Sequence, residues 1–326
     1  MDKQERGTKS DSTGKGKFIA IGIAIAIVIS IAMGVAMSTR GSAPQSPNSE
    51  ISSNSRTVSW IHVHGLGVDP SNSSILYIAT HGDFYKSVNG GTPVKIDKQR
   101  ADYMAFNAPQ TAGVPLYSSG HPSTGGNTGL IKSTDGGQTW DVVATVLDPP
   151  VDFHAMAVSK SVPNVIIGYD SGGRGIFKTP DAGQTWQRLD NPPVQYVTSL
   201  AISPTDPMVV FAGTNSGLYE SNDGAATWTH LNQYEGIAVQ ALAFDVDGNL
   251  YTSTEESGLA KSSDSGKSWE KINRPPDSLT ATSIAVDSQD KTIYVAGYAA
   301  PQGYQEVFRS SSLSGVGWQL VGTNRK

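Results

Sequence analysis

The sequence contains no cysteine. This absence excludes disulfide bonds, iron–sulfur clusters, thiol nucleophiles and lipid attachment through cysteine. Charged residues are also scarce, at 16% of the 326 residues, whereas the chain has 35 glycines and 18 prolines. Few charges and many turn-forming residues are typical of a turn-rich β protein. The formal net charge of −5 argues against a nucleic-acid partner, because such partners require a basic surface.

One long apolar run lies near the N-terminus. Residues 18–37 read FIAIGIAIAIVISIAMGVAM, twenty residues without a charge. As a helix this run would be about 30 Å long, which matches the hydrocarbon thickness of a bilayer. Five Lys and Arg residues precede it, so the positive-inside rule leaves the N-terminus in the cytoplasm. We expect a single-pass anchor in the cell membrane. A cleaved secretory signal is the alternative, and in both cases the folded part is extracytoplasmic.

These features divide the chain into four parts. Residues 1–17 form a basic cytoplasmic segment and residues 18–37 a transmembrane helix. Residues 38–56 are rich in Ser, Pro, Gly and Asn and lack core-forming residues, which predicts a flexible linker. Residues 57–326 form the folded domain.

A short motif recurs through the folded domain. The pattern is S/T-x-D-x-G/A-x-T/S-W, and its four good copies are STDGGQTW (133–140), TPDAGQTW (179–186), SNDGAATW (221–228) and SSDSGKSW (262–269). A decayed copy ends at Trp318, so successive tryptophans are 46, 42, 41 and 49 residues apart. A period of this length indicates a repeat architecture.

Each copy of the motif predicts a β-hairpin corner. The Asp carboxylate and the Ser or Thr hydroxyl accept backbone N–H bonds, the glycine permits positive φ, and the tryptophan packs between neighbouring sheets. Alternating apolar runs and turn residues upstream of each corner add further short strands. Four strands per period is the pattern of a propeller blade.

The copies resemble Asp-box (BNR) repeats, which occur in sialidases, xyloglucanases, sortilin-type receptors and propellers of the photosystem II assembly factor type. The resemblance covers most of residues 57–323 and implies an all-β propeller of four-stranded blades with Asp-box hairpins. It says little about chemistry, because the motif recurs across unrelated activities. The assembly-factor resemblance implies a module that docks another exported protein, and the xyloglucanase resemblance implies a glycan ligand or a glycoside hydrolase.

The number of blades follows from the candidate innermost strands. Six segments qualify, namely 61–70, 102–110, 152–160, 197–205, 239–247 and 282–290. We therefore predict six blades. The residues TVSW (57–60) are expected to pair near the last strand, WQLVG (318–322), and so close the ring.

Five of the six histidines map to one face of this predicted propeller. His62 and His64 begin the first inner strand and His154 begins the third, while His81 and His121 fall in loops between the second and third strands of their blades. Because side chains alternate along a strand, the first two histidines point to the same side. The sixth, His230, follows a corner motif and is expected at the surface.

This histidine-rich funnel suggests a metal site. Imidazole nitrogen favours Zn²⁺ or Cu²⁺ over Ca²⁺ or Mg²⁺, and three or four of the five histidines would be its ligands. Asp102 and Asp152, which begin neighbouring inner strands, would orient the rings. The alternative is a polar funnel whose histidines bind only backbone and water.

The same two carboxylates are the candidates for catalysis. A glycoside hydrolase requires two carboxyl groups flanking the scissile bond, and Asp102 and Asp152 are the best placed. Whether the protein is an enzyme therefore stays open at this point. The interpretation that we favour is a membrane-anchored binding or scaffold module that holds Zn or Cu, with an extracellular glycoside hydrolase as the alternative.

Overall fold

The computed structural model describes residues 56–326 except 110, 191, 193–195, 277 and 288. The predicted segments 1–17 and 18–37, and nearly all of 38–56, lie outside the described residues. Within the described ranges, no helix combines the length and the apolar character needed to cross a bilayer.

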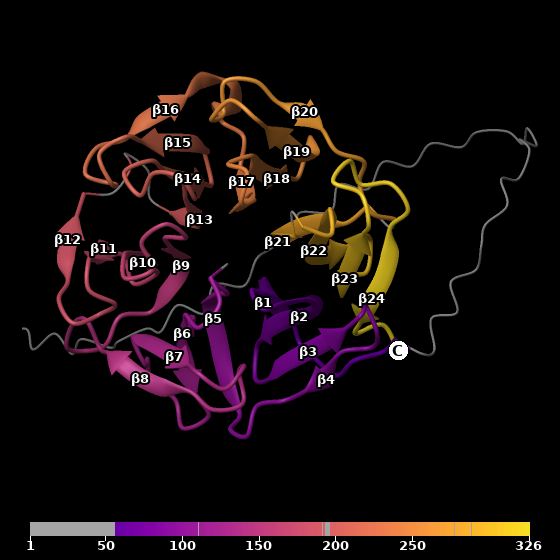
Figure 1. Ribbon diagram of the computed structural model, residues 1–326, viewed down its shortest axis with the longest axis horizontal. Coiled ribbons are helices and arrows are strands. Elements are labelled where there is room, and N and C mark those ends of the chain that lie inside the picture. The colour runs from indigo at the N-terminus through magenta and orange to yellow at the C-terminus, as the bar shows by residue number, and fades with distance from the viewer. Residues whose placement is uncertain (1–55, 110, 191, 193–195, 277, 288) are drawn as a thin grey trace, which may run out of the picture. The chain divides into compact units, whose positions relative to one another are not determined.

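The described part of the chain folds into six four-stranded antiparallel sheets arranged in a ring, which confirms the predicted six-bladed propeller (Figure 1). Blades one to three comprise β1 (Val63–Asp69), β2 (Asn72–Thr80), β3 (Phe84–Val88), β4 (Val94–Lys95); β5 (Ala101–Asn107), β6 (Leu116–Pro122), β7 (Leu130–Ser133), β8 (Asp141–Ala144); and β9 (Phe153–Val158), β10 (Ile166–Asp170), β11 (Gly175–Thr179), β12 (Gln187–Leu189). Blades four to six comprise β13 (Val197–Ile202), β14 (Val210–Thr214), β15 (Gly217–Ser221), β16 (Thr229–Leu231); β17 (Val239–Phe244), β18 (Leu250–Thr254), β19 (Gly258–Ser262), β20 (Glu270–Lys271); and β21 (Thr280–Asp287), β22 (Thr292–Ala299), β23 (Tyr304–Ser310), β24 (Gln319–Thr323). A short 3₁₀ helix, η2 (Asn232–Tyr234), precedes β17.

The order of strands decides which residues share a face. In every blade the strands run in sequence order from the centre outward, so β1, β5, β9, β13, β17 and β21 surround the axis (Figure 1). Because neighbouring strands are antiparallel, the inner strands begin on the same face as the turns between second and third strands. We call this face the mouth. The corners between third and fourth strands lie on the opposite face.

The core is distributed between the blades. Each of the six clusters of buried apolar residues joins two neighbouring sheets. Between blades one and two, for example, Phe84 packs against Tyr103 and Trp140 with ring centroids 5.3 and 5.2 Å away. Burial of such a side chain stabilises the fold by roughly 1.5–3 kcal/mol. Trp140 comes from a corner motif, so its expected position between sheets is confirmed.

The corners have the predicted hydrogen bonds. Asp135 Oδ1 accepts the backbone N–H groups of Gln138 and Thr139 at 3.0 and 2.9 Å, and Oδ2 accepts the Thr139 hydroxyl at 2.7 Å. Gly137 has a φ of +88°, and a Cβ there would lie 2.3 Å from the ring of Phe84. The motif therefore needs glycine for two reasons, conformation and space. The same pair of hydrogen bonds occurs in three other corners. There the backbone N–H and the hydroxyl of the Thr or Ser four residues later donate to the carboxylates of Asp181, Asp223 and Asp264.

The ring closes through the two ends of the described domain. Thr57 forms a parallel bridge with Thr323 of β24, and Val58 N donates to the Thr323 carbonyl at 2.8 Å. Trp60 is buried next to this bridge, and its indole N–H donates to the Gln305 carbonyl at 3.3 Å. The expected pairing of residues 57–60 with the last strand is thus confirmed.

Candidate metal centre

The mouth collects histidines from the first three blades. His62 directly precedes β1, His64 lies in β1, and His81 occupies the turn between β2 and β3. His121 lies near the end of β6, and His154 is the second residue of β9. All five therefore belong to the segments that the antiparallel order brings to the mouth, as predicted, although His121 lies within β6 and not in the loop after it.

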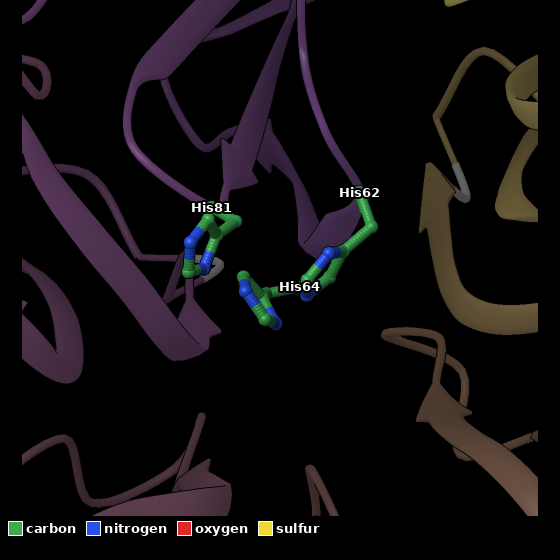
Figure 2. Close-up of side chains that lie close together, drawn as sticks. All are labelled: His62, His64 and His81. Atoms are coloured by element: carbon green, nitrogen blue, oxygen red, sulfur yellow. The ribbon is translucent and has the colours of Figure 1, made fainter. Parts of the chain in front are cut away.

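Three of these imidazoles form one group, which we call the three-histidine group: His62, His64 and His81 (Figure 2). One ligand nitrogen from each ring lies within 4.8 Å of the others. The ring centroid of His62 lies 4.3 Å from that of His64 and 5.2 Å from that of His81. The His81 backbone N–H donates to the His62 carbonyl at 3.0 Å, so the turn after β2 is held against the start of blade one. The spacing suits three ligands of a single ion after small rotamer changes.

Asp102 of blade two faces this group. Its Oδ2 lies 2.8 Å from His81 Nδ1, in hydrogen-bond geometry. Its Oδ1 lies 2.9 Å from His64 Nε2, but the two atoms are out of line for a hydrogen bond and both are buried. Burial acts to raise the pKa of Asp102, but the contact with His64 and the charges of His64 and His81 outweigh it, so the pKa is lowered. Asp102 is therefore an anion beside the imidazoles.

His62 has the most perturbed imidazole of the group. Burial, and then the neighbouring His64 and His81, lower its pKa from 6.5 to about 4, although Asp102 opposes the shift. At neutral pH this ring is therefore uncharged. Because a metal binds the neutral imidazole, His62 has no proton to lose before coordination.

The second group consists of His121, Asp152 and His154. We call it the His121 group, and its ligand atoms also lie within 4.8 Å of one another. His154 Nε2 lies 3.0 Å from Asp152 Oδ2, which also accepts the Ser171 hydroxyl at 2.8 Å. Burial acts to raise the pKa of Asp152, but His154 and the Ser171 bond outweigh it, so the pKa is lowered.

The two groups adjoin without merging. Asp102 and His121 are directly opposite partners in β5 and β6, and His64 and His154 line one cavity of about 110 Å³ on the axis. The sequence led us to expect one centre with three or four histidine ligands. Two groups form instead because His64 and His81 of blade one contact Asp102 of blade two, whereas His121 of blade two and His154 of blade three both contact Asp152.

Buried polar residues next to the His121 group fix the position of Asp152. The backbone N–H of Asp152 donates to Asp170 Oδ1 at 2.7 Å. Asp170 is fully buried and paired with Arg174, which also donates to the carbonyls of Pro149 and Pro150. Ser171 was not predicted from the sequence as a partner of Asp152. Its place in the turn between β10 and β11, which corresponds to that of His81 in blade one, is the signal that could have identified it.

His230 lies apart from both groups. It belongs to β16, the outer strand of blade four, and its ring centroid lies 4.8 Å from that of Tyr219. It is partly buried by this contact rather than free at the surface. His230 is therefore a suitable control position for experiments on the mouth.

The electrostatics of Asp102 and Asp152 bear on catalysis. A glycosidase needs one carboxyl group with a raised pKa to act as general acid. The pKa values of Asp102 and Asp152 are both lowered. The axial cavity of about 110 Å³ is also smaller than the roughly 300–1,000 Å³ of typical ligand pockets. These features suit an ion with its water better than a sugar chain.

Comparisons with known proteins support the fold. No family model matches the chain. A probable oligoxyloglucan-reducing end-specific xyloglucanase of Neosartorya fischeri is 35% identical over 86 residues, which is 24% of this chain and 11% of that protein. The chain thus spans about a tenth of the curated relative that it matches.

Solved propeller structures are similar over most of the chain. The GH74 enzyme of Niastella koreensis has a TM-score of 0.61 at 18% identity, over 79% of this chain and 45% of its own. The GH74 xyloglucanase from Xanthomonas campestris has a TM-score of 0.54 at 16% identity, with the same coverage. YCF48 bound to D1 peptide has a TM-score of 0.46 at 17% identity, over 69% of this chain and 68% of its own. The chain spans less than half of either GH74 protein, and at these identities the likeness concerns the fold alone.

Proposed function

We propose that this protein is a membrane-anchored, extracytoplasmic β-propeller that binds Zn²⁺ or Cu²⁺ at the three-histidine group. The observation that carries the proposal is the convergence of three imidazole nitrogens within 4.8 Å at the mouth. The low pKa of His62 and the anionic Asp102 add to it, since a cation is favoured beside a neutral imidazole and a carboxylate. The imidazole-only set favours Zn²⁺ and Cu²⁺ over ions that prefer oxygen.

The location outside the cell rests on the sequence of the N-terminal segment. Residues 18–37 are long and apolar enough to span a bilayer, and basic residues precede them. The propeller would then stand beyond a linker of about twenty residues. Such a module can bind metal in the extracytoplasmic space while it stays attached to the cell.

Metal analysis of paired variants tests this proposal. The full chain, purified in detergent, is incubated with Zn²⁺ or Cu²⁺ and dialysed, and bound metal is counted by elemental analysis. The double variant His62→Ala/His64→Ala should lose one equivalent. Its affinity at this group should fall at least about a thousandfold, because the variant lacks two of the three ligands and structural zinc sites bind with about 10–16 kcal/mol in total. The variant His230→Ala should bind as much metal as the wild type. A wild-type chain that binds neither ion, or a double variant that binds as much as the wild type, would refute the proposal.

A second candidate function is glycoside hydrolysis, favoured by the local sequence match to a xyloglucanase. In that case Asp102 and Asp152 would be the catalytic pair. The lowered pKa of both groups counts against this candidate, because neither can hold a proton at neutral pH. Hydrolysis of xyloglucan oligosaccharides by the wild type, lost in Asp102→Asn and in Asp152→Asn, would favour the enzyme. Bound metal without turnover would favour the binding module.

A further inference from the structure

We propose that the His121 group is a second metal site, separate from the three-histidine group, which takes a divalent first-row ion through two imidazole nitrogens and one carboxylate oxygen. This inference rests on the proposed function, since it assigns a second ion to the same mouth. The His121 group includes a carboxylate ligand, whereas the three-histidine group consists of imidazoles alone.

One nitrogen of His121 faces a buried oxygen of Asp152. His121 Nδ1 lies 3.0 Å from the Gly126 carbonyl, which can only accept, so Nδ1 donates this bond and Nε2 is the nitrogen left for a ligand. Nε2 lies 3.5 Å from Asp152 Oδ1. That oxygen is buried and has no hydrogen-bond partner among the described residues. A buried oxygen without a partner is costly to leave, and an ion held by Nε2 and Oδ1 would satisfy it.

The carboxylate of Asp152 is held in this position. Its other oxygen accepts the Ser171 hydroxyl at 2.8 Å, and its backbone N–H is bonded to the buried Asp170. A turn of the side chain that brought its free oxygen toward another donor would break the Ser171 bond and the 3.0 Å contact of Oδ2 with His154 Nε2. The Gly126 carbonyl likewise fixes His121, as the outer hydrogen bond of a metal-bound imidazole usually does. The group is preorganised before an ion arrives.

The ligand set indicates the class of ion. Two histidines and one carboxylate hold Fe²⁺ and Zn²⁺ in sites that keep open coordination positions. The side chains of His121 and His154 are 32% and 30% exposed, so solvent can reach those positions. The three-histidine group lacks an oxygen ligand of its own, since both Asp102 oxygens face His64 and His81. The two sites should therefore differ in preference, with the oxygen-containing site the more tolerant of harder ions.

The test counts equivalents of one ion in matched variants. The full chain in detergent is loaded with Zn²⁺ alone, dialysed and analysed for zinc. We expect two equivalents in the wild type and in His230→Ala, and one equivalent in each double variant, His121→Ala/His154→Ala and His62→Ala/His64→Ala. Circular dichroism confirms that each variant is folded. Should the alanine pair not fold, His121→Gln/His154→Gln removes the same ligands with less loss of volume.

The remaining outcomes separate this inference from the proposed function. One equivalent in the wild type, lost only in His62→Ala/His64→Ala, overturns the second site and leaves the first. One equivalent lost in both double variants shows a single shared ion and overturns the inference as well. One equivalent lost only in His121→Ala/His154→Ala supports the second site and overturns the first. No bound zinc in the wild type overturns both.

Discussion

The aspartates at the two faces of the propeller differ in how completely they are hydrogen-bonded. At the corners, Asp135 accepts bonds from the Gln138 and Thr139 backbone, the Thr139 hydroxyl and the Ser133 hydroxyl, all within seven residues of sequence. At the mouth, Asp102 and Asp152 each keep one buried oxygen without a hydrogen bond among the described residues. The same side chain thus completes a turn at one face and remains available to a ligand at the other.

The two faces also differ in whether their polar residues recur from blade to blade. The corner bonds recur in four blades, whereas histidines approach the mouth only from blades one to three. Every blade requires the same type of corner, so the same motif recurs along the chain. A binding site needs to be built once, so its residues break the repeat. A structural carboxylate therefore has all its oxygens hydrogen-bonded and recurs from blade to blade, whereas a functional one keeps an oxygen free and occurs once. The following predictions test this distinction.

The largest expected effect concerns metal-linked stability. Free Zn²⁺ at a thousand times the dissociation constant of a site should raise the free energy of unfolding by about 4 kcal/mol for each site occupied, because it binds only the folded mouth. Denaturant titrations with Zn²⁺ and with a chelator measure this increment. It should vanish when His62, His64, His121 and His154 are all alanine, and persist in Asp135→Ala. An equal increment in the two proteins would contradict the distinction between the faces.

The next effect separates the two kinds of aspartate directly. Asp102→Asn removes the charge beside His64 and His81 and should weaken Zn²⁺ binding at the three-histidine group about 10- to 100-fold. Asp223→Asn makes the same change at a corner and should leave the affinity unaltered. Calorimetric titration of both variants provides the measurement. Similar affinities for the two variants would mean that Asp102 does not support the metal.

A smaller effect should appear in the pH dependence of the metal-free protein. His62 has a pKa of about 4 when folded and 6.5 when unfolded, so between these values the unfolded chain binds the extra proton. The free energy of unfolding should therefore fall as the pH drops from 6.5 to 4, by about 1–2 kcal/mol after allowance for solvent screening. His62→Gln should flatten this slope, and an unchanged slope would contradict the assignment.

The corner aspartates should titrate in a different window. Hydrogen bonds from Thr139 and Ser133 outweigh burial and lower the pKa of Asp135 from 3.8 to about 2. A lowered carboxyl pKa stabilises the fold above 3.8, and this contribution is lost as the pH falls toward 2. Because the pKa values of Asp102 and Asp152 are lowered as well, carboxylates at both faces lose their contribution below pH 4. The loss of stability between pH 6.5 and 4 belongs to His62 at the mouth.

The smallest effect is the local cost of removing a corner. Asp135→Ala deletes the acceptor of several short-range bonds and should lower the free energy of unfolding by about 1 kcal/mol, as for the loss of a helix cap. Chemical denaturation measures it. Zinc stoichiometry should stay at the wild-type value. Loss of bound metal in this variant would show that the corners and the mouth are coupled.

The fold could be predicted from the sequence because its signals are local. Each corner is fixed by bonds among residues 133–140 or their equivalents, and the tryptophan spacing counts the blades. The predicted inner strands 197–205 and 239–247 begin where β13 and β17 begin. The predictions run three residues too long at their ends, because the turn residues there continue the alternating pattern.

The candidate site was predictable only in part. Antiparallel order alone places the five histidines at the mouth, so their common face could be predicted. Their division into two groups depends on which carboxylate each ring meets. The contact of Asp102 with His81 joins two blades, whereas that of Asp152 with His154 lies within one blade. Ser171 escaped prediction because a lone serine in a Gly-rich turn has no distinctive pattern. The contact between Asp102 and His81 depends on packing between blades, which no single segment encodes.

The parallel bridge between Thr57 and Thr323 has a mechanical consequence. Thr57 and the buried Trp60 both precede His62 in the chain, so a force applied at Arg56 would reach the bridge first. The Thr323 N–H donates to the Arg56 carbonyl and the Val58 N–H donates to the Thr323 carbonyl, so β24 would bear this force through two hydrogen bonds. The last blade would thus resist the displacement before it reached His62, two residues beyond Trp60.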